Sequence, residues 1–290
     1  MKHRFMFGIA LWAVVTSALL AFGQTAQLEL PRSIEAGKAL SIASSGSGKA
    51  VLYIVGPAQA LRHDVQLGEK VDLAPGELHN AGHYSVFLVG PTSMQSAQLD
   101  VTSAPQAAAL SFLAKPSRLA VDMRDGISGV VYVFDAFRNL VLQPAQVSFE
   151  LSETGGPTQT RTATTHDGVA WLRLNSAPKA GAAQFLARVG DVTEKRIVQQ
   201  VPGEPCNLRM SARRSGPRIE LETDQLRDCK GNAVPDGTVV TFTERNGGTE
   251  STVDVPLKRG VAQTTLPAED GATLSVATGV VMGNEIRWPR

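Results

Sequence analysis

Four histidines follow the N-terminal segment of this 290-residue chain, and histidine is the side chain most often used to bind metals. They are His63, His79, His83 and His166. His79 and His83 are four residues apart, a spacing that would suit a zinc pair on one helix face. Ala81 and Gly82 between them favour a turn followed by a strand instead, and no third ligand is evident. We therefore expect two surface turn residues and no metal site.

The only cysteines, Cys206 and Cys229, both lie in the last third of the chain. An even number of cysteines in an oxidising compartment favours a disulfide. Cys206 opens a predicted strand and Cys229 closes the next antiparallel one, and such opposite ends of a hairpin are neighbours in space. We predict a Cys206–Cys229 disulfide, and two unpaired buried thiols are the alternative.

Several predicted turns contain an aspartate, a residue that could bind calcium. These aspartates are Asp135, Asp167, Asp191, Asp228 and Asp236. Calcium takes six or more oxygen ligands, and no dense run of Asp and Asn supplies them. An aspartate that accepts hydrogen bonds from nearby backbone amides explains each position without a metal.

No group of residues suited to nucleophilic or acid–base catalysis is evident. We predict no catalytic, cofactor-binding or metal residues, no cofactor, and a protein that is not an enzyme. The formal net charge is +1, from 28 basic and 27 acidic residues spread along the chain, which argues against a nucleic-acid partner. Trp171 and Trp288 are expected to pack in a core or against a sheet edge, with sugar platforms as the alternative.

A pattern that occurs twice indicates how the chain is organised. The first copy has Asp135, Asn139, Val141, Val147 and Phe149, and the second has Asp228, Asn232, Val234, Val240 and Phe242. In both copies the later residues follow the aspartate at offsets of 4, 6, 12 and 14. A Gly-Val-Ala triplet follows each copy, at 168–170 and at 260–262. Repeats of this length and composition predict tandem β-domains, which serve mostly as scaffolds or binding modules.

Short strands separated by turn signals account for nearly everything after residue 25. The run 50–55 is a plain apolar strand, and Tyr84, Val86 and Leu88 alternate with their neighbours as one face of another. Each unit is expected to be a seven-stranded antiparallel sandwich. The segment 105–109 and the Pro-Gly-Glu-Pro stretch after Val201 predict domain junctions, because proline interrupts a ladder.

The N-terminus predicts export. Lys2, His3 and Arg4 precede an uncharged, apolar stretch from 5 to 22, and Gly23 provides a small residue at a possible cleavage site. We expect a signal peptide at 1–23, with a retained membrane anchor as the alternative. The domains are then expected at 25–104, 105–202 and 203–290, in an exported protein that is extracellular, surface-bound or periplasmic and has no further membrane span.

Residues 228–242, DCKGNAVPDGTVVTF, resemble the bacterial immunoglobulin-like repeat of invasin and intimin type. Gly260-Val261-Ala262 and the stretch 271–277, GATLSVA, continue that likeness. The resemblance covers 105–290, and in its weaker first copy Arg138 replaces the turn glycine. It implies an all-β fold of tandem immunoglobulin-like sandwiches that carry no catalytic residues. The first domain is expected to be a generic sandwich of this class, with Tyr84 bonded back to the preceding turn as a tyrosine corner.

The resemblance, together with the lack of catalytic residues, predicts a structural or adhesive protein. The expected partner is another envelope or extracellular protein, which could bind by strand addition to a sheet edge. A carbohydrate-binding accessory array is the alternative. Exposed aromatic residues aligned on one face would favour it, and Trp171, Tyr53 and Tyr132 are the candidates.

Overall fold

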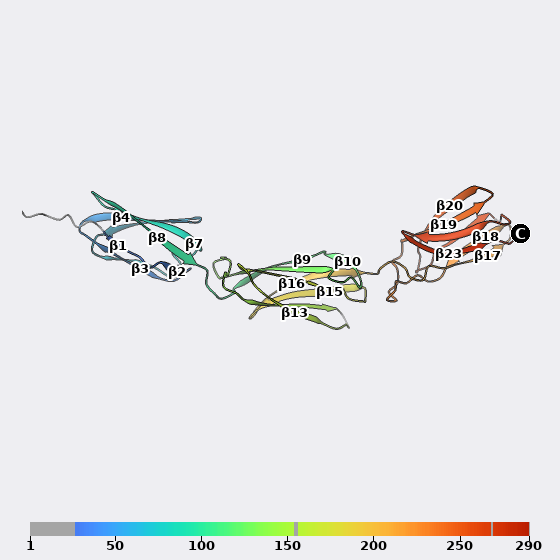
Figure 1. Cartoon of the computed structure of the whole chain (residues 1–290), viewed down its shortest axis with the longest axis horizontal. Helices are drawn as coiled ribbons and strands as arrows, with labels where there is room; N and C mark the ends of the chain where they lie inside the picture. The colour runs from blue at the N-terminus through green and yellow to red at the C-terminus, as the bar shows by residue number, and fades with distance from the viewer. Residues whose placement is uncertain (1–26, 154–155, 268, 290) are drawn as a thin grey trace, which may run out of the picture. The chain divides into compact units, whose positions relative to one another are not determined.

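The computed structural model describes residues 27–153, 156–267 and 269–289. The predicted signal peptide at 1–23 lies outside these residues. The described chain is built of β-strands and contains no helix, as expected for an all-β protein (Figure 1). Its described residues fall into two compact units, with the division after Thr102. The first unit contains one β-sandwich and the second contains two, each with its own hydrophobic core.

The first sandwich comprises β1 to β8. These are β1 (Gln27–Glu29), β2 (Ser33–Glu35), β3 (Leu40–Ser45), β4 (Lys49–Gly56), β5 (Gln59–Gln66), β6 (Lys70–Leu73), β7 (Gly82–Val89) and β8 (Met94–Thr102). A three-stranded sheet, β1-β3-β6, packs on a five-stranded sheet, β2-β8-β7-β4-β5. Alternate residues of β4 and β7 are buried between the sheets, among them Leu52, Ile54, Val86 and Leu88.

Tyr84 lies at the centre of the first core, fully buried. Its hydroxyl donates to the carbonyl of Asn80, at 2.8 Å, and lies 2.9 Å from the Gln59 side-chain oxygen. The tyrosine corner expected from the sequence is therefore confirmed. Burial raises the pKa of the hydroxyl.

The second sandwich comprises β9 to β16. These are β9 (Ala109–Lys115), β10 (Arg118–Ala120), β11 (Ile127–Phe134), β12 (Gln146–Glu153), β13 (Gln159–Thr164), β14 (Val169–Leu174), β15 (Gly181–Val189) and β16 (Val192–Val201). Its sheets are β14-β11-β9 and β10-β16-β15-β12-β13. Phe112, Phe149 and Phe185 meet in its core with ring centroids 4.9–6.1 Å apart.

The third sandwich comprises β17 to β23. These are β17 (Met210–Ser215), β18 (Arg218–Thr223), β19 (Val239–Asn246), β20 (Thr249–Pro256), β21 (Gln263–Pro267), β22 (Thr273–Thr278) and β23 (Val281–Arg287). Its sheets are β17-β18-β21 and β20-β19-β22-β23. Val240 and Phe242 of the repeat are fully buried in its core, as Val147 and Phe149 are in the second sandwich.

The expectation of seven antiparallel strands per unit holds for the third sandwich only. The first two sandwiches have eight strands. In each, the chain crosses to the other sheet after its first strand and forms a short extra strand there, β2 or β10, which pairs in parallel with the last strand, β8 or β16. Pro31 and Pro116 stand at these changes and cannot donate to a ladder. In the third sandwich β17 and β18 are separated only by Gly216 and Pro217, which leaves no residues for such a strand.

The Gly-Val-Ala elements begin with the same tight turn in both copies. His166 pairs with Val169 and Lys258 pairs with Val261 around it. The two central residues are left-handed in each case, with φ of 48° and 78° in the first copy and 54° and 79° in the second. This is the type I′ hairpin turn, whose twist matches that of the flanking strands.

The packing of Tyr84 predicts the effect of a single methyl group. A Cβ built on Gly56 would overlap the Tyr84 ring, whereas one built on Gly90 would come no closer than 3.4 Å, to the carbonyl oxygen of Ser93. We expect Gly56→Ala to lower the free energy of unfolding of the first unit by about 1–3 kcal/mol, because the ring is held by its hydroxyl bonds. Gly90→Ala, the control, should leave it nearly unchanged. Equal effects in chemical denaturation would contradict this packing.

Candidate functional site

The repeated aspartate of the second sandwich is buried and fully bonded. Asp135 is 1% exposed, and its Oδ1 accepts the backbone N–H groups of Phe137 and Asn139 at 2.9 and 2.8 Å. Its Oδ2 accepts the Asn139 side-chain amide at 2.9 Å. Arg138, which replaces the turn glycine, takes the left-handed conformation with φ of 67°. The carboxylate therefore accepts hydrogen bonds that hold the turn closed, as the sequence predicted.

The third sandwich repeats this geometry. Asp228 is 6% exposed, and its Oδ1 accepts the backbone N–H groups of Lys230 and Asn232, both at 2.9 Å. The side-chain amide of Asn232 donates to Oδ2 at 2.8 Å, and Gly231 is left-handed with φ of 83°. Burial raises the pKa of Asp228, but bonds from the Asn232 side chain and the backbone outweigh it and lower the pKa below its usual range.

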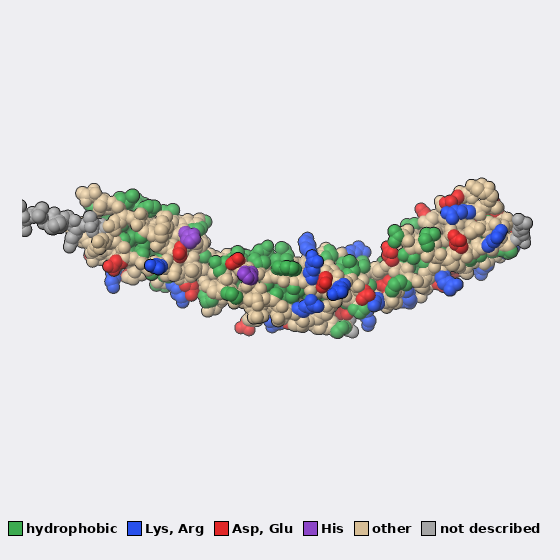
Figure 2. Space-filling view, viewed as in Figure 1, with side chains coloured by type: hydrophobic (Ala, Val, Ile, Leu, Met, Phe, Trp, Pro, Cys, Tyr) green, Lys and Arg blue, Asp and Glu red, His purple; other side chains and the backbone are tan. Residues whose placement is uncertain are grey.

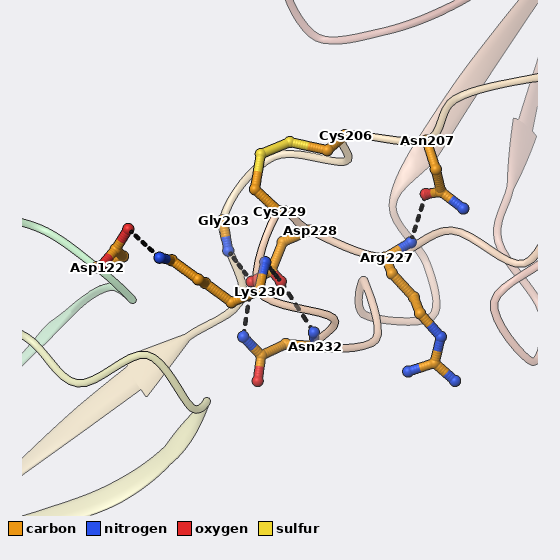
Figure 3. Close-up of a disulfide and its surroundings, with 9 residues drawn as sticks. All are labelled: Asp122, Gly203, Cys206, Asn207, Arg227, Asp228, Cys229, Lys230 and Asn232. Atoms are coloured by element: carbon orange, nitrogen blue, oxygen red, sulfur yellow. Dashed lines mark hydrogen bonds and ion pairs between the residues drawn. A yellow bond between two sulfur atoms is a disulfide. The ribbon is translucent and has the colours of Figure 1, made fainter.

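Each aspartate also binds the chain that leads into its sandwich, an arrangement that we call the aspartate clamp. Oδ2 of Asp135 accepts the backbone N–H of Ala104 at 3.1 Å, and Oδ2 of Asp228 accepts that of Gly203 at 3.0 Å (Figure 3). One carboxylate thus closes a turn and fixes the entering segment. This second role is not visible in the sequence, because Ala104 and Gly203 lie 31 and 25 residues upstream with no shared local signal.

The second clamp extends to the preceding sandwich within the same unit. The Asn232 side chain donates to the carbonyl of Pro178 at 2.9 Å and accepts the N–H of Ala180 at 3.0 Å. Lys230 Nζ lies 3.0 Å from the carboxylate of Asp122 (Figure 3). Both charges are partly exposed, so this ion pair contributes little compared with the amide bonds.

The cysteines flank the same clamp. Cys206 and Cys229 form a disulfide with a Cα–Cα distance of 5.1 Å, as predicted. Neither residue lies in a strand, however, because β17 begins at Met210 and β18 ends at Thr223. An isolated bridge between Pro205 and Asp228 and a bond from the Cys206 N–H to the Arg227 carbonyl bring the two segments together. The disulfide therefore ties the entering segment to the residue beside the clamp aspartate.

The two closely spaced histidines have separate partners. His79 Nδ1 lies 3.0 Å from the carbonyl oxygen of Gly76, in the segment before β7. His83 faces outward on β7, where its Nδ1 contacts the carboxylate of Asp100. In the parts of the chain that the structure describes, no group of three or more His, Cys, Asp or Glu residues is placed to hold a metal ion. Nor does any helix within those parts have the length and apolar character needed to cross a membrane.

The aromatic candidates separate into exposed and buried residues. Trp171 is 66% exposed on β14, so the expectation that it packs in the core or against an edge was wrong. Its strand is an edge strand, but its side chain points away from the core, because the neighbouring Ala170 points inward. Trp288 is 7% exposed, as expected for a packed residue. Tyr132 lies on the same outer face as Trp171, whereas Tyr53 belongs to the other unit.

A buried carboxylate was also missed. Glu244 follows Val240 and Phe242 on the inward face of β19 and is 5% exposed, at a position where the second sandwich has Leu151. Burial raises the pKa of Glu244, and the nearby charge of Glu269 adds to the rise. The alternation of inward and outward residues on this strand was visible in the sequence, but we did not expect a charged side chain, Glu244, at the next inward position.

The paired sheets, with a separate core in each sandwich, define tandem immunoglobulin-like sandwiches. The fold is similar to that of FdeC, an Escherichia coli adhesin, with 15% identity over 88% of this chain and 91% of that chain and a TM-score of 0.57. It is also similar to invasin, a bacterial integrin-binding protein, with 13% identity and a TM-score of 0.50, although the match spans only 59% of that chain.

A third structure of this kind is InvD of Yersinia pseudotuberculosis, with 14% identity over 90% of this chain and 96% of that chain and a TM-score of 0.51. The resemblance to invasin-type repeats is thereby confirmed for the fold. No protein-family profile and no curated protein sequence matches the chain.

The lowered pKa of Asp228 predicts a pH dependence. A carboxyl group whose pKa is lower in the folded protein than in the unfolded chain stabilises the fold. This stabilisation is fully present above the pKa of the unfolded chain, near pH 4, and is lost as the pH falls through the pKa of the folded protein. We expect Asp228→Asn to destabilise the third sandwich by about 2–4 kcal/mol at pH 7, because it leaves buried N–H groups without acceptors. The difference from wild type should shrink below about pH 4.

Hydrogen exchange of β18 and β19 in the full chain measures this difference. The control is Asp270→Asn, since Asp270 is largely exposed and lies 3.6 Å from Arg214 in a surface ion pair. A difference between wild type and Asp228→Asn that stays constant from pH 7 to pH 3 would contradict the role of the charge.

The disulfide gives a further prediction. It joins residues 23 positions apart, and a loop of this size corresponds to about 3 kcal/mol of stabilisation. We expect no reactive thiol in the denatured, unreduced protein and a loss of that order in the third sandwich of Cys206→Ser/Cys229→Ser. Two titratable thiols per chain would refute the bond.

Proposed function

We propose that this chain is an exported, non-enzymatic adhesion module of the cell envelope or cell surface that binds an extracellular or envelope protein. Its domains are 25–104, 105–202 and 203–290, behind a signal peptide at 1–23. The basic and then apolar N-terminus and the disulfide support export.

The observation that carries the proposal is the use of the clamp aspartates. Asp135 and Asp228 are the acidic residues that the sequence repeats, and both are saturated with amide donors that close a turn and fix an entering segment. Carboxylates whose oxygens are occupied in this way hold chain segments in place and so serve a structural role. Tandem sandwiches suit a protein that presents a binding surface, and structures of the same fold include an adhesin and an integrin-binding protein.

A carbohydrate-binding array is the second candidate, and one observation favours it. Trp171 is largely exposed and shares its face with Tyr132, the kind of aromatic surface that the alternative requires. Both classes of ligand are therefore included in the test.

The test uses the chain from residue 24 to 290, immobilised and presented to a panel of purified extracellular-matrix proteins, to the envelope fraction of the producing cell and to a glycan array. We expect saturable binding of a protein that protease treatment of that ligand abolishes. The same chain after reduction and heat unfolding is the control. Saturable glycan binding without a protein ligand would favour the second candidate and overturn the first.

A further inference from the structure

The outer face of the sheet β14-β11-β9 in the second sandwich carries an apolar surface that no core requires. Trp171 of β14 lies opposite Val130 of β11, and Val130 lies opposite Leu113 of β9, so the three form one row across the sheet. Trp171 is 66% exposed and Leu113 is 48% exposed. Tyr132 stands in the next row, opposite Val169, within diagonal reach of Trp171. We call these five residues the Trp171 face.

The space-filling view agrees with this description. Figure 2 shows hydrophobic side chains gathered over the region of β9, with Lys and Arg side chains next to them. Exposed contiguous apolar surface of this kind marks interaction sites in soluble proteins. Tryptophan and tyrosine are also the side chains enriched where binding energy concentrates.

The third sandwich shows that the fold does not need this surface. There the residue after the Gly-Val-Ala triplet is Gln263 where the second sandwich has Trp171. Gln263 lies opposite Glu222, and Glu222 lies opposite Ser211, so the corresponding row is entirely polar. Two sheets with the same topology in one chain thus differ in the chemistry of one face. The apolar row is therefore specific to the second sandwich.

The charges around the Trp171 face indicate the chemistry of its partner. The adjacent row is Arg173, Ser128 and Lys115, with both cations exposed. Within the described chain neither cation has an ion-pair or hydrogen-bond partner, unlike Arg196 of the opposite sheet, which is paired with Glu194. Two unpaired cations beside an apolar row complement an apolar patch that is flanked by acidic groups.

The neighbours of Trp171 favour a protein over a sugar. In its own row Trp171 has only Val130 and Leu113, which offer no hydrogen bond to the hydroxyls of a sugar ring. An aliphatic row that ends in a tryptophan on the edge strand suits the apolar side chains of a protein.

We propose that the Trp171 face is the docking surface for an extracellular protein that presents apolar side chains next to acidic ones. The proposal deepens the function proposed above and rests on it. Trp171 inserts among the apolar side chains of the partner, and Lys115 and Arg173 pair with its carboxylates. Because Lys115 and Arg173 both lie in the row on one side of the Trp171 row, the partner's acidic groups must lie on that side, and this fixes the orientation of the partner along the strands.

The test selects ligands for the wild-type chain, residues 24–290, from a random 12-residue peptide library displayed on phage. We expect recovered peptides that combine aromatic or aliphatic residues with Asp or Glu. Trp171→Gln, which installs the residue of the third sandwich, should weaken the affinity of these peptides at least tenfold. The double variant Lys115→Glu/Arg173→Glu should weaken their affinity to a similar extent and should remove most of the dependence of that affinity on salt concentration.

Matched controls lie on the opposite sheet of the same sandwich. Ile197 is 59% exposed on β16, and Lys195 is exposed two residues before it on the same face. Ile197→Ala and Lys195→Glu should leave the affinity unchanged. Unchanged hydrogen exchange of β11 and β12 in every variant shows that the sandwich is intact.

The outcomes separate the two proposals. A protein ligand that binds the chain but tolerates Trp171→Gln leaves the adhesion function standing and overturns the docking surface. Peptides without acidic residues overturn the charge assignment. Glycan binding lost on Trp171→Gln, or self-association in sedimentation lost on the same change, assigns the face to a sugar or to a second copy and overturns the proposal. Failure of every protein and peptide to bind overturns both proposals.

Discussion

A buried carboxylate at the beginning of each repeat is the interaction on which the second unit depends. Asp135 and Asp228 each replace lost hydration with four amide donors, three from their own turn and one from the entering segment. An ionised group is buried at a large cost unless it is bonded in this way. The turn and the entering segment are therefore coupled, because removing either leaves the same charge short of donors.

This coupling explains why the junction residues and the repeat belong together. In the third sandwich the disulfide adds a covalent tie between the entering segment and Cys229, next to the clamp aspartate. Asn232 bonds both the aspartate and the loop of the preceding sandwich at Pro178 and Ala180. Several constraints thus act on one short segment, and together they restrict its conformations more than any one of them would.

The outer faces of the sheets are free of these constraints. Several inward positions are the same in both copies, such as Val147 and Phe149 against Val240 and Phe242, because they must fill a close-packed core. Outward positions carry no such requirement, so one copy has Trp171 where the other has Gln263. This freedom matters for the proposed binding role, because function resides in sites carried on a fold and not in the fold itself.

The sequence by itself indicated the strand-rich fold, the tandem arrangement of sandwiches and the disulfide partners, because these follow from local alternation, repeated spacing and a single pair of cysteines. It identified the Asp-Asn turns for the same reason. Only the tertiary structure decided that Asp135 and Asp228 hold upstream amides, that the first two sandwiches gain a parallel strand, and that Trp171 faces solvent beside Val130 and Leu113. These features depend on which strands become neighbours, and pairing between distant strands leaves no signal in the spacing of either one.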